Sequence, residues 1–103
     1  MASSKEYLAY VLEQLSELDG VSWRAMMGEY ILYYRGRVIG GIYDDRFLVK
    51  PTKAGAALMP DAGTEVPYDG AKEMLLVDCV DDRDLLKELF EAMIGELPAP
   101  RGK

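Results

Sequence analysis

The chain contains no histidine and only one cysteine, Cys79. Histidine is the commonest general base and the commonest transition-metal ligand, so its absence excludes many catalytic mechanisms and many metal sites. A single cysteine cannot form an intrachain disulfide, which fits a reducing compartment. We therefore expect a cytoplasmic protein that is not an enzyme and that carries no cofactor.

Long apolar runs are also missing. No stretch approaches the roughly 20 residues that a membrane helix needs, and residues 1–6 lack the apolar core of a signal peptide. With 103 residues, half of them hydrophobic and 29% charged, the composition is that of one globular domain rather than a disordered chain. We predict a single domain over residues 1–98 and a flexible tail over residues 99–103.

Basic residues are few and scattered. The chain has 12 basic and 18 acidic residues, a net charge of −6. Affinity for nucleic acids comes chiefly from basic side chains that neutralise phosphates, so direct nucleic-acid binding is disfavoured. Such binding would require a local basic face, which only Arg24, Arg35, Arg37 and Arg46 could build.

The N-terminal segment predicts an amphipathic helix over residues 3–18. Ser3 and Glu6 have the spacing of a capping box, in which each side chain satisfies a backbone N–H near the other. Asp19-Gly20 is expected to end the helix. Apolar residues recur at helical spacing and form one stripe: Leu8, Val11, Leu12, Leu15 and Leu18.

Residues 21–50 predict a meander of four antiparallel strands, because apolar and polar residues alternate between turn signals. The first strand starts at Val21, and the next three cover residues 29–34, 37–43 and 46–50. The turns fall at Gly28, at Arg35-Gly36 and at Asp44-Asp45. Two glycines inside a strand, Gly40-Gly41, are costly unless a bulge or a closely packed element requires them, and we expect a helix across the sheet at this point.

The second half predicts a short helix, a hairpin and a final helix. The helix covers residues 52–59, and Asp69-Gly70 should form a tight turn between strands 64–68 and 72–77. The final helix starts at Asp81–Asp84 and presents an apolar face of Leu85, Leu86, Leu89, Phe90, Met93 and Ile94. The fold class is thus α+β, a two-layer fold of antiparallel meander and hairpin with terminal helices, in the order α-β-β-β-β-α-β-β-α.

Candidate catalytic groups have plainer structural explanations. Cys79 follows an apolar strand and has no histidine to activate it, so a half-buried packing role is favoured. The acidic residues Asp78, Asp81, Asp82 and Asp84 do not match a calcium loop, and helix capping explains most of them. Glu29 should pair with Arg24 or Arg37 across strands. An acid/base pair of Glu29 with Asp44 stays open.

Tyrosine is abundant in the meander and hairpin, at positions 30, 33, 34, 43 and 68. For any one of them ordinary cross-strand packing is the simpler explanation. Tyrosine is nevertheless enriched at protein interfaces, where its ring supplies contact area and its hydroxyl stays paired. As a group these tyrosines indicate that one face or edge of the sheet meets a protein partner or a second copy of the chain.

The stretch Arg24–Lys50 resembles the N-terminal domain of the TfoX/Sxy regulators of natural competence. The resemblance lies in Arg24-Ala-Met-Met-Gly28, the glycine turn at Gly36, Asp44-Asp45 and the closing Leu48-Val49-Lys50. The preceding helix, the segment at residues 66–68 and the final helix follow in the same order. Met27 and Glu29 differ from the residues common in the family, and 103 residues leave room for this N-terminal domain alone.

The resemblance implies a non-enzymatic regulatory or adaptor domain, frequently a homodimer, that acts by protein–protein contacts in DNA-uptake competence. The implied partner is a transcription factor, such as the cyclic-AMP receptor protein, or RNA polymerase. No catalytic residue comes with the family. Signature positions that could serve the fold or an interaction are Arg24, Met27, Gly28, Tyr30, Tyr33, Gly36 and Lys50.

One alternative of a different class stays open. The chain could be a small-ligand-binding domain or a minor enzyme with a pocket between helix and sheet. Gly40-Gly41 and Arg24 would then mark the pocket, and the arginine would bind a carboxylate or phosphate.

Overall fold

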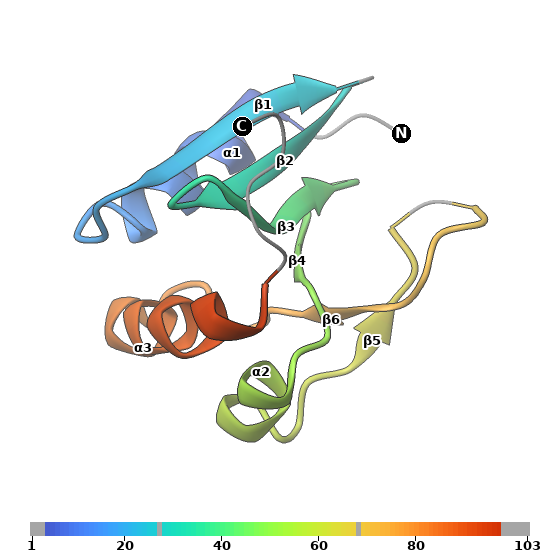
Figure 1. The fold of residues 1–103 in the computed structure, drawn as a ribbon. Coiled ribbons are helices and arrows are strands. Elements are labelled where there is room, and N and C mark those ends of the chain that lie inside the picture. Colours follow the sequence, from blue (N-terminus) through green and yellow to red (C-terminus); the bar gives the residue numbers. More distant parts are fainter. Residues whose placement is uncertain (1–3, 27, 68, 98–103) are drawn as a thin grey trace.

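The computed structural model describes residues 4–26, 28–67 and 69–97. Within these residues the helices and strands follow the predicted order, which confirms the α+β class (Figure 1). The elements are α1 (Lys5–Gln14), β1 (Val21–Met26), β2 (Glu29–Tyr34), β3 (Arg37–Tyr43), β4 (Arg46–Val49), α2 (Lys53–Leu58), β5 (Thr64–Glu65), β6 (Met74–Leu76), α3 (Arg83–Met93) and the 3₁₀ turn η1 (Ile94–Glu96).

The strands form one antiparallel sheet in the order β1-β2-β3-β4-β6-β5. Two-residue turns join β2 to β3 and β3 to β4. Arg35 and Gly36 have φ angles of 53° and 81°, and Asp44 and Asp45 have 54° and 57°. Positive φ at both central residues is the mark of the type I′ turn, whose twist matches that of paired strands. Both turns lie where the sequence predicts them.

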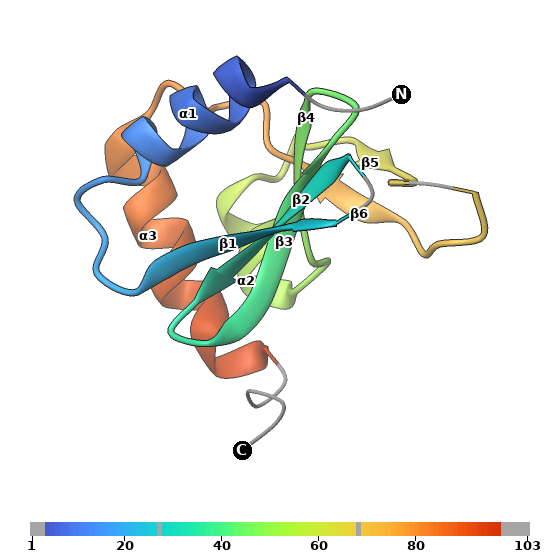
Figure 2. The same ribbon diagram turned by 90° about the horizontal axis from the view of Figure 1, so that it is seen from above.

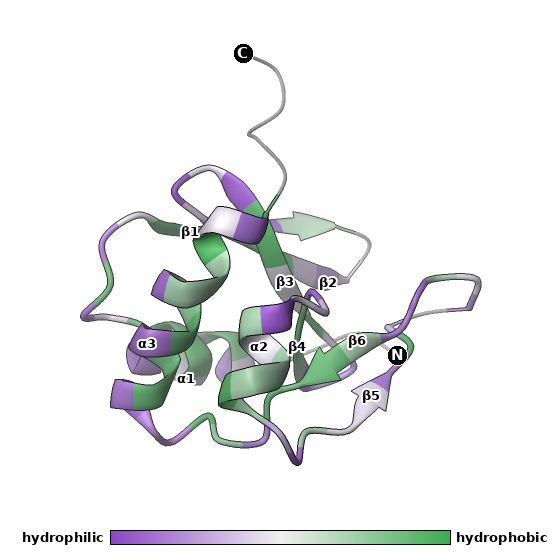
Figure 3. Ribbon diagram, turned by 60° about the horizontal axis from the view of Figure 1, so that its bottom comes forward, coloured by the Kyte–Doolittle hydropathy of each residue, from purple (hydrophilic) through white to green (hydrophobic). Residues whose placement is uncertain are grey.

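All three helices lie on one side of the sheet, as Figure 2 shows from above. Figure 3 shows α2 and α3 in the foreground, each with hydrophobic and hydrophilic stretches. The core lies between the two layers, and Phe90 of α3 is at its centre. Its ring centroid is 5.5 Å from that of Tyr34 in β2 and 6.3 Å from that of Phe47 in β4. These ring contacts pack α3 against both β2 and β4.

Helix α1 is shorter than predicted. Its N-cap is Ser4, whose hydroxyl accepts a backbone N–H of the first turn at 3.1 Å, and Ser3 lies outside the described residues. The helix ends at Gln14 rather than near residue 18. Gly20 therefore does not cap it: its φ is 92°, and its carbonyl accepts the Arg35 N–H at 2.8 Å, so Gly20 extends the pairing of β1 with β2.

The closest contacts of Gly40-Gly41 are with strand residues and not with the expected helix. A Cβ on Gly40 would meet the backbone of β4, at the Leu48 carbonyl and 2.7 Å from the Val49 Cα. A Cβ on Gly41 would lie 2.7 Å from the Tyr43 ring. The pairing of β2 with β3 also shifts register nearby, between residues 32 and 33. Close strand backbones and a ring folded over the sheet, not a helix, require glycine here.

The hairpin of β5 and β6 has a longer loop than predicted. Thr64 pairs with Leu75 and Glu65 with Met74, so residues 66–73 form the loop and Asp69-Gly70 is not a two-residue turn. Pro67 has no N–H for a ladder hydrogen bond, which explains why β5 stops before it. Residue 68 and the predicted tail, 99–103, lie outside the described residues.

Helix capping explains the acidic start of α3. The Asp82 side chain accepts the Leu85 N–H at 3.1 Å, and Asp84 lies in the first turn, near the positive end of the helix dipole. The predicted capping role of this acidic segment is confirmed.

The carboxylate of Glu96 caps α2 from the C-terminal side of the fold. It accepts the backbone N–H groups of Lys53 and Ala54, each at 2.9 Å. These hydrogen bonds, helped by the charge of Lys53, lower the pKa of Glu96. A carboxylate with a lowered pKa contributes stability above its ordinary pKa, and that stability is lost as the pH falls through the folded-state pKa.

Glu96→Gln is therefore expected to lower the Tm at neutral pH, because the uncharged amide binds the two N–H groups less well. The difference from the wild type should shrink as the pH falls below the ordinary carboxyl range. Thermal unfolding of both proteins at neutral and acidic pH checks this. A Tm difference that does not change with pH would show that the charge of Glu96 does not matter.

Candidate interaction surface

The sheet has a second face that no described helix covers, which we call the outer face. Along β2, Tyr30, Leu32 and Tyr34 point toward the helices and are buried, whereas Ile31 and Tyr33 point the other way and are half-buried. The register carries this alternation across the sheet, because Ile31 pairs with Gly41, Gly41 with Leu48, and Leu48 with Leu76. The large apolar and aromatic members of the outer face are Met26, Ile31, Tyr33, Val38, Tyr43, Leu48, Met74 and Leu76.

Leu48 shows how closely this face is packed. Its side chain is fully buried, yet it does not belong to the core cluster between helices and sheet. Beside it the Tyr43 ring lies over Gly41. Of the other large apolar and aromatic members, Met26 is exposed and the rest are half-buried. Together they form an apolar surface made by side chains of β1, β2, β3, β4 and β6.

Charged residues stand at the margins of the outer face. Arg46 donates to the Glu65 carboxylate at 2.7 Å and to the Tyr43 carbonyl at 3.1 Å, which neutralises the margin near β5. Arg24 of β1 is exposed at the opposite margin. The Glu29 carboxylate accepts the Asp44 N–H at 3.1 Å, a contact that holds the turn between β3 and β4. An apolar centre with polar margins is typical of protein contact surfaces.

The four arginines proposed for a basic face do not gather on one surface. Arg37 points to the helix side, where its guanidinium donates to the Leu97 carbonyl at 3.1 Å. The Arg35 guanidinium lies 5.1 Å from the ring centroid of Tyr34 in the core. Arg24 and Arg46 lie on the outer face, and Arg46 is paired with an acid. The arrangement does not form the positive patch that phosphate binding requires.

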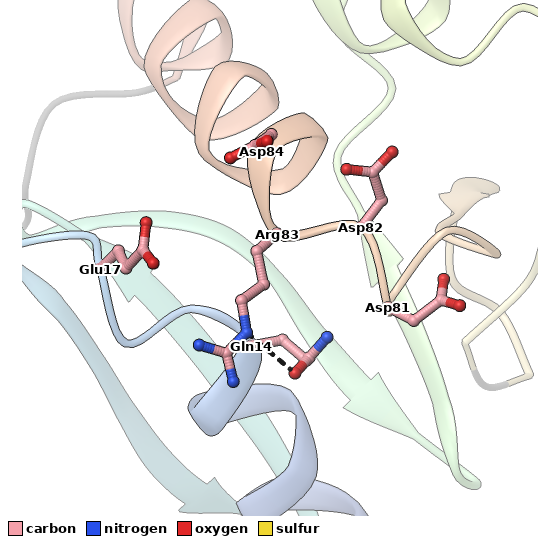
Figure 4. Close-up of a pocket in the computed structure, with 6 residues that line it drawn as sticks. All are labelled: Gln14, Glu17, Asp81, Asp82, Arg83 and Asp84. Atoms are coloured by element: carbon pink, nitrogen blue, oxygen red, sulfur yellow. Dashed lines mark hydrogen bonds between the residues drawn. The ribbon is translucent and has the colours of Figure 1, made fainter.

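The predicted pocket residues also lie apart. Gly40 faces the helix side against β4, whereas Arg24 is exposed on the outer face. A polar hollow does occur elsewhere, between the end of α1 and the start of α3 (Figure 4). Arg83 crosses it and donates to Gln14 and Glu13, each at 3.3 Å. The hollow is lined by Gln14, Glu17, Asp81, Asp82, Arg83 and Asp84.

Reactive groups do not converge within the described residues. Cys79 is half-buried, and its Sγ lies 4.0 Å from the Sδ of Met59. Burial and the nearby charge of Asp78 raise the pKa of the thiol, so it stays protonated and weakly nucleophilic at neutral pH. In residues 4–26, 28–67 and 69–97, no group of three acidic or sulfur ligands could hold a metal ion.

Comparison with known proteins agrees with the fold. The family model of the TfoX N-terminal domain matches residues 13–94, from the last turn of α1 through all the strands to the end of α3. The chain belongs to this family. An uncharacterized 12.7 kDa protein in the trpE 5′ region of Spirochaeta aurantia is 34% identical over 102 residues, which cover 98% of this chain and 89% of that protein. No solved structure matches the chain.

The TfoX N-terminal domain family is not a known family of enzymes. Membership of the chain in this family confirms the resemblance inferred from Arg24–Lys50. None of the described helices is both long and apolar enough to cross a membrane.

The signature positions of this TfoX N-terminal domain do not converge on one site. Gly28 (φ 86°) and Gly36 (φ 81°) lie in the turns at the two ends of β2. Tyr30 is buried against the core, whereas Arg24 and Tyr33 are neighbours on the outer face. The remaining two are Lys50, which donates its N–H to the Ile39 carbonyl beyond the end of β4, and Met27, which lies outside the described residues.

Sequence analysis did not identify the exposure of β1. Trp23 and Met26 are 47% and 49% exposed, although the apolar alternation of this strand looks like that of a buried one. The alternation gives the faces of a strand but not its place in the sheet. Because β1 lies at the edge, nothing in its own sequence signals that its apolar side chains stay in contact with solvent.

Proposed function

We propose that this chain is a non-enzymatic, cytoplasmic regulatory or adaptor domain that acts by protein–protein contacts. The observation that carries the proposal is the outer face, an apolar and aromatic surface on the side of the sheet away from the helices. Membership of the TfoX N-terminal domain family supports a role in regulating DNA-uptake competence. The partner expected on this ground is a transcription factor or RNA polymerase.

Tyrosine chemistry suits the proposed contact. A tyrosine ring supplies large contact area at a small cost in side-chain entropy, and interface tyrosines often carry much of the binding free energy. Tyr33 is half-buried near the C-terminal end of β2 and has Val38 opposite it on β3. It is the aromatic residue that we expect to be at the centre of the contact.

Tyr33→Ala is expected to weaken capture of a transcription or signalling protein by about 30-fold, the effect of losing an interface hot spot. Tyr10→Ala is the matched control, because Tyr10 is a 43% exposed tyrosine on α1, on the helix side. The measurement is quantitative affinity capture from cell lysate with the immobilised wild-type chain and both variants. Equal capture by Tyr33→Ala and the wild type, or enrichment of no such protein, would contradict the proposal.

A further inference from the structure

The two edges of the sheet differ in how they are protected. At one edge β5 has only two residues, ends in Glu65 and is followed by Pro67, all features that discourage pairing with another strand. At the other edge β1 has six residues, no proline and unbroken pairing with β2 from Val21 to Met26. A long, regular edge strand of this kind is a template for a further strand.

The hydrogen-bond pattern shows which backbone groups of β1 face outward. The Arg35 N–H bonds to the Gly20 carbonyl at 2.8 Å, so this pair is of the hydrogen-bonded kind. Bonded and non-bonded pairs alternate along an antiparallel ladder. Val21, Trp23 and Ala25 are therefore in non-bonded pairs with β2, and their N–H and C=O groups point away from the sheet.

The side chains of β1 are equally uncovered. Five of its six residues are exposed, counting both faces of the strand. Two of the four large hydrophobic side chains that are exposed in the described residues, Trp23 and Met26, belong to it. The Trp23 indole packs edge-to-face with the Tyr30 ring, with 5.6 Å between the ring centroids, and it stays exposed to solvent. Exposed apolar side chains beside outward backbone groups mark a pairing surface.

We propose that β1 pairs antiparallel with β1 of a second copy of this chain, about a two-fold axis at Trp23. Val21 then lies opposite Ala25 of the second copy, and Ser22 lies opposite Arg24. All three outward residues of each copy take part in bonded pairs, with two hydrogen bonds in each pair. The two indoles meet across the axis on the helix side, where each already contacts its own Tyr30.

Charge and hydrogen bonding both favour this register. Centring the pair on Arg24 would set two arginines directly opposite each other, which is destabilising. It would also leave Val21 opposite residue 27 and use fewer of the outward groups. The chain has a net charge of −6, so two copies repel each other. Because β1 itself carries no acidic residue, the repelling charges lie away from the proposed contact, and salt screens the repulsion between them.

The size of the contact predicts a reversible dimer. One strand pair and two indoles give an interface at the low end of the range for specific complexes, below about 1,200 Å² in total. We expect dissociation in the micromolar range rather than a permanent dimer. The inference does not depend on the proposed function, because the edge of β1 and the outer face are different surfaces.

Sedimentation velocity over a concentration series tests the dimer. The wild type is expected to shift from monomer to dimer as the concentration rises, whereas Trp23→Lys and Ala25→Pro should remain monomers. The proline removes an outward-pointing N–H but breaks no hydrogen bond between β1 and β2. Val66→Lys is the matched control, since it replaces a 42% exposed apolar residue near the other edge, and it should dimerise as the wild type does. Circular dichroism verifies that each variant is folded. A wild type that stays monomeric, or a folded Trp23→Lys that still dimerises, would overturn the proposal.

Cysteine crosslinking tests the register, in a Cys79→Ser background. Mixed Ser22→Cys and Arg24→Cys chains should form a disulfide-linked heterodimer, because residues 22 and 24 face each other in a non-bonded pair with Cα atoms about 4.5 Å apart. Arg24→Cys alone should crosslink poorly, since its two copies would be diagonal neighbours about 7–8 Å apart. Efficient crosslinking of Arg24→Cys alone would place the axis at Arg24 and overturn the Trp23-centred pairing.

Discussion

Gly40→Ala is expected to lower the free energy of unfolding by about 3 kcal/mol or more, because a β-carbon at this position would overlap the backbone of β4. The nearest atoms are the Leu48 carbonyl group and the Val49 Cα, and a paired strand cannot move away as the end of a flexible side chain can. Domains of this size unfold with about 5–15 kcal/mol in total, so the variant should be partly unfolded or very easily denatured.

Gly63→Ala is the control for this experiment. A Cβ on Gly63 meets no heavy atom within 4 Å, and the residue does not have a positive φ. Its replacement should leave stability unchanged or raise it slightly, because alanine restricts the unfolded chain. Urea denaturation of the two variants and the wild type compares the two glycines directly. Near-equal midpoints for Gly40→Ala and the wild type would show that β3 and β4 are not as close as described.

Phe90→Ala is expected to cost about 3–5 kcal/mol, the usual range for removing a fully buried aromatic ring. The ring is 0% exposed and contacts both Tyr34 and Phe47, so its loss leaves a cavity between α3 and the middle of the sheet. The strands beside the ring are held by hydrogen bonds to their neighbours, which limits how far the core can collapse into that space.

Glu91→Ala is the matched control for Phe90→Ala, because it changes the next residue of the same helix on its exposed side. Its effect should stay within about 0.5 kcal/mol. In urea denaturation, Phe90→Ala should lower the midpoint strongly while Glu91→Ala does not. A cost below about 1 kcal/mol for Phe90→Ala would mean that the ring is not at the centre of the core.

Local patterns were sufficient to predict most of the elements. Alternation between residues 29 and 49, with two-residue turns at Arg35-Gly36 and Asp44-Asp45, predicted β2, β3 and β4 to within a residue or two. Such strands and type I′ turns depend on neighbours in sequence, so the sequence shows them. The apolar stripe of α3 and the capping aspartate predicted the last helix in the same way.

The errors concern contacts between distant parts of the chain. The early end of α1, the role of Gly40 and the long loop between β5 and β6 all follow from how separate elements meet, which periodicity does not record. The same reason explains the exposure of Trp23, because the strand order that leaves β1 at an edge comes from the whole sheet.

The candidate surface was predicted only in outline. Sequence analysis expected several tyrosines at a face or edge of the sheet, and the fold separates them. Tyr33 and Tyr43 lie on the outer face, whereas Tyr30 and Tyr34 are buried toward the helices. The aliphatic members of that face, such as Leu48 and Val38, were not singled out, because an apolar residue in a strand is ordinarily assigned to the core.

We propose two separate contact surfaces, the outer face for a protein partner and the edge of β1 for a second copy. The outer face is the basis of the proposed function. The functional proposal therefore depends on what the outer face binds.

Photo-crosslinking in living cells tests this central claim most directly. A benzophenone amino acid is introduced at Tyr33 or Tyr43 on the outer face, and at Lys87 or Glu91 on the exposed side of α3. The account predicts crosslinks to a transcription or signalling protein from positions 33 and 43 but not from 87 and 91. Crosslinks from the α3 positions alone, or from none of the four, would contradict it.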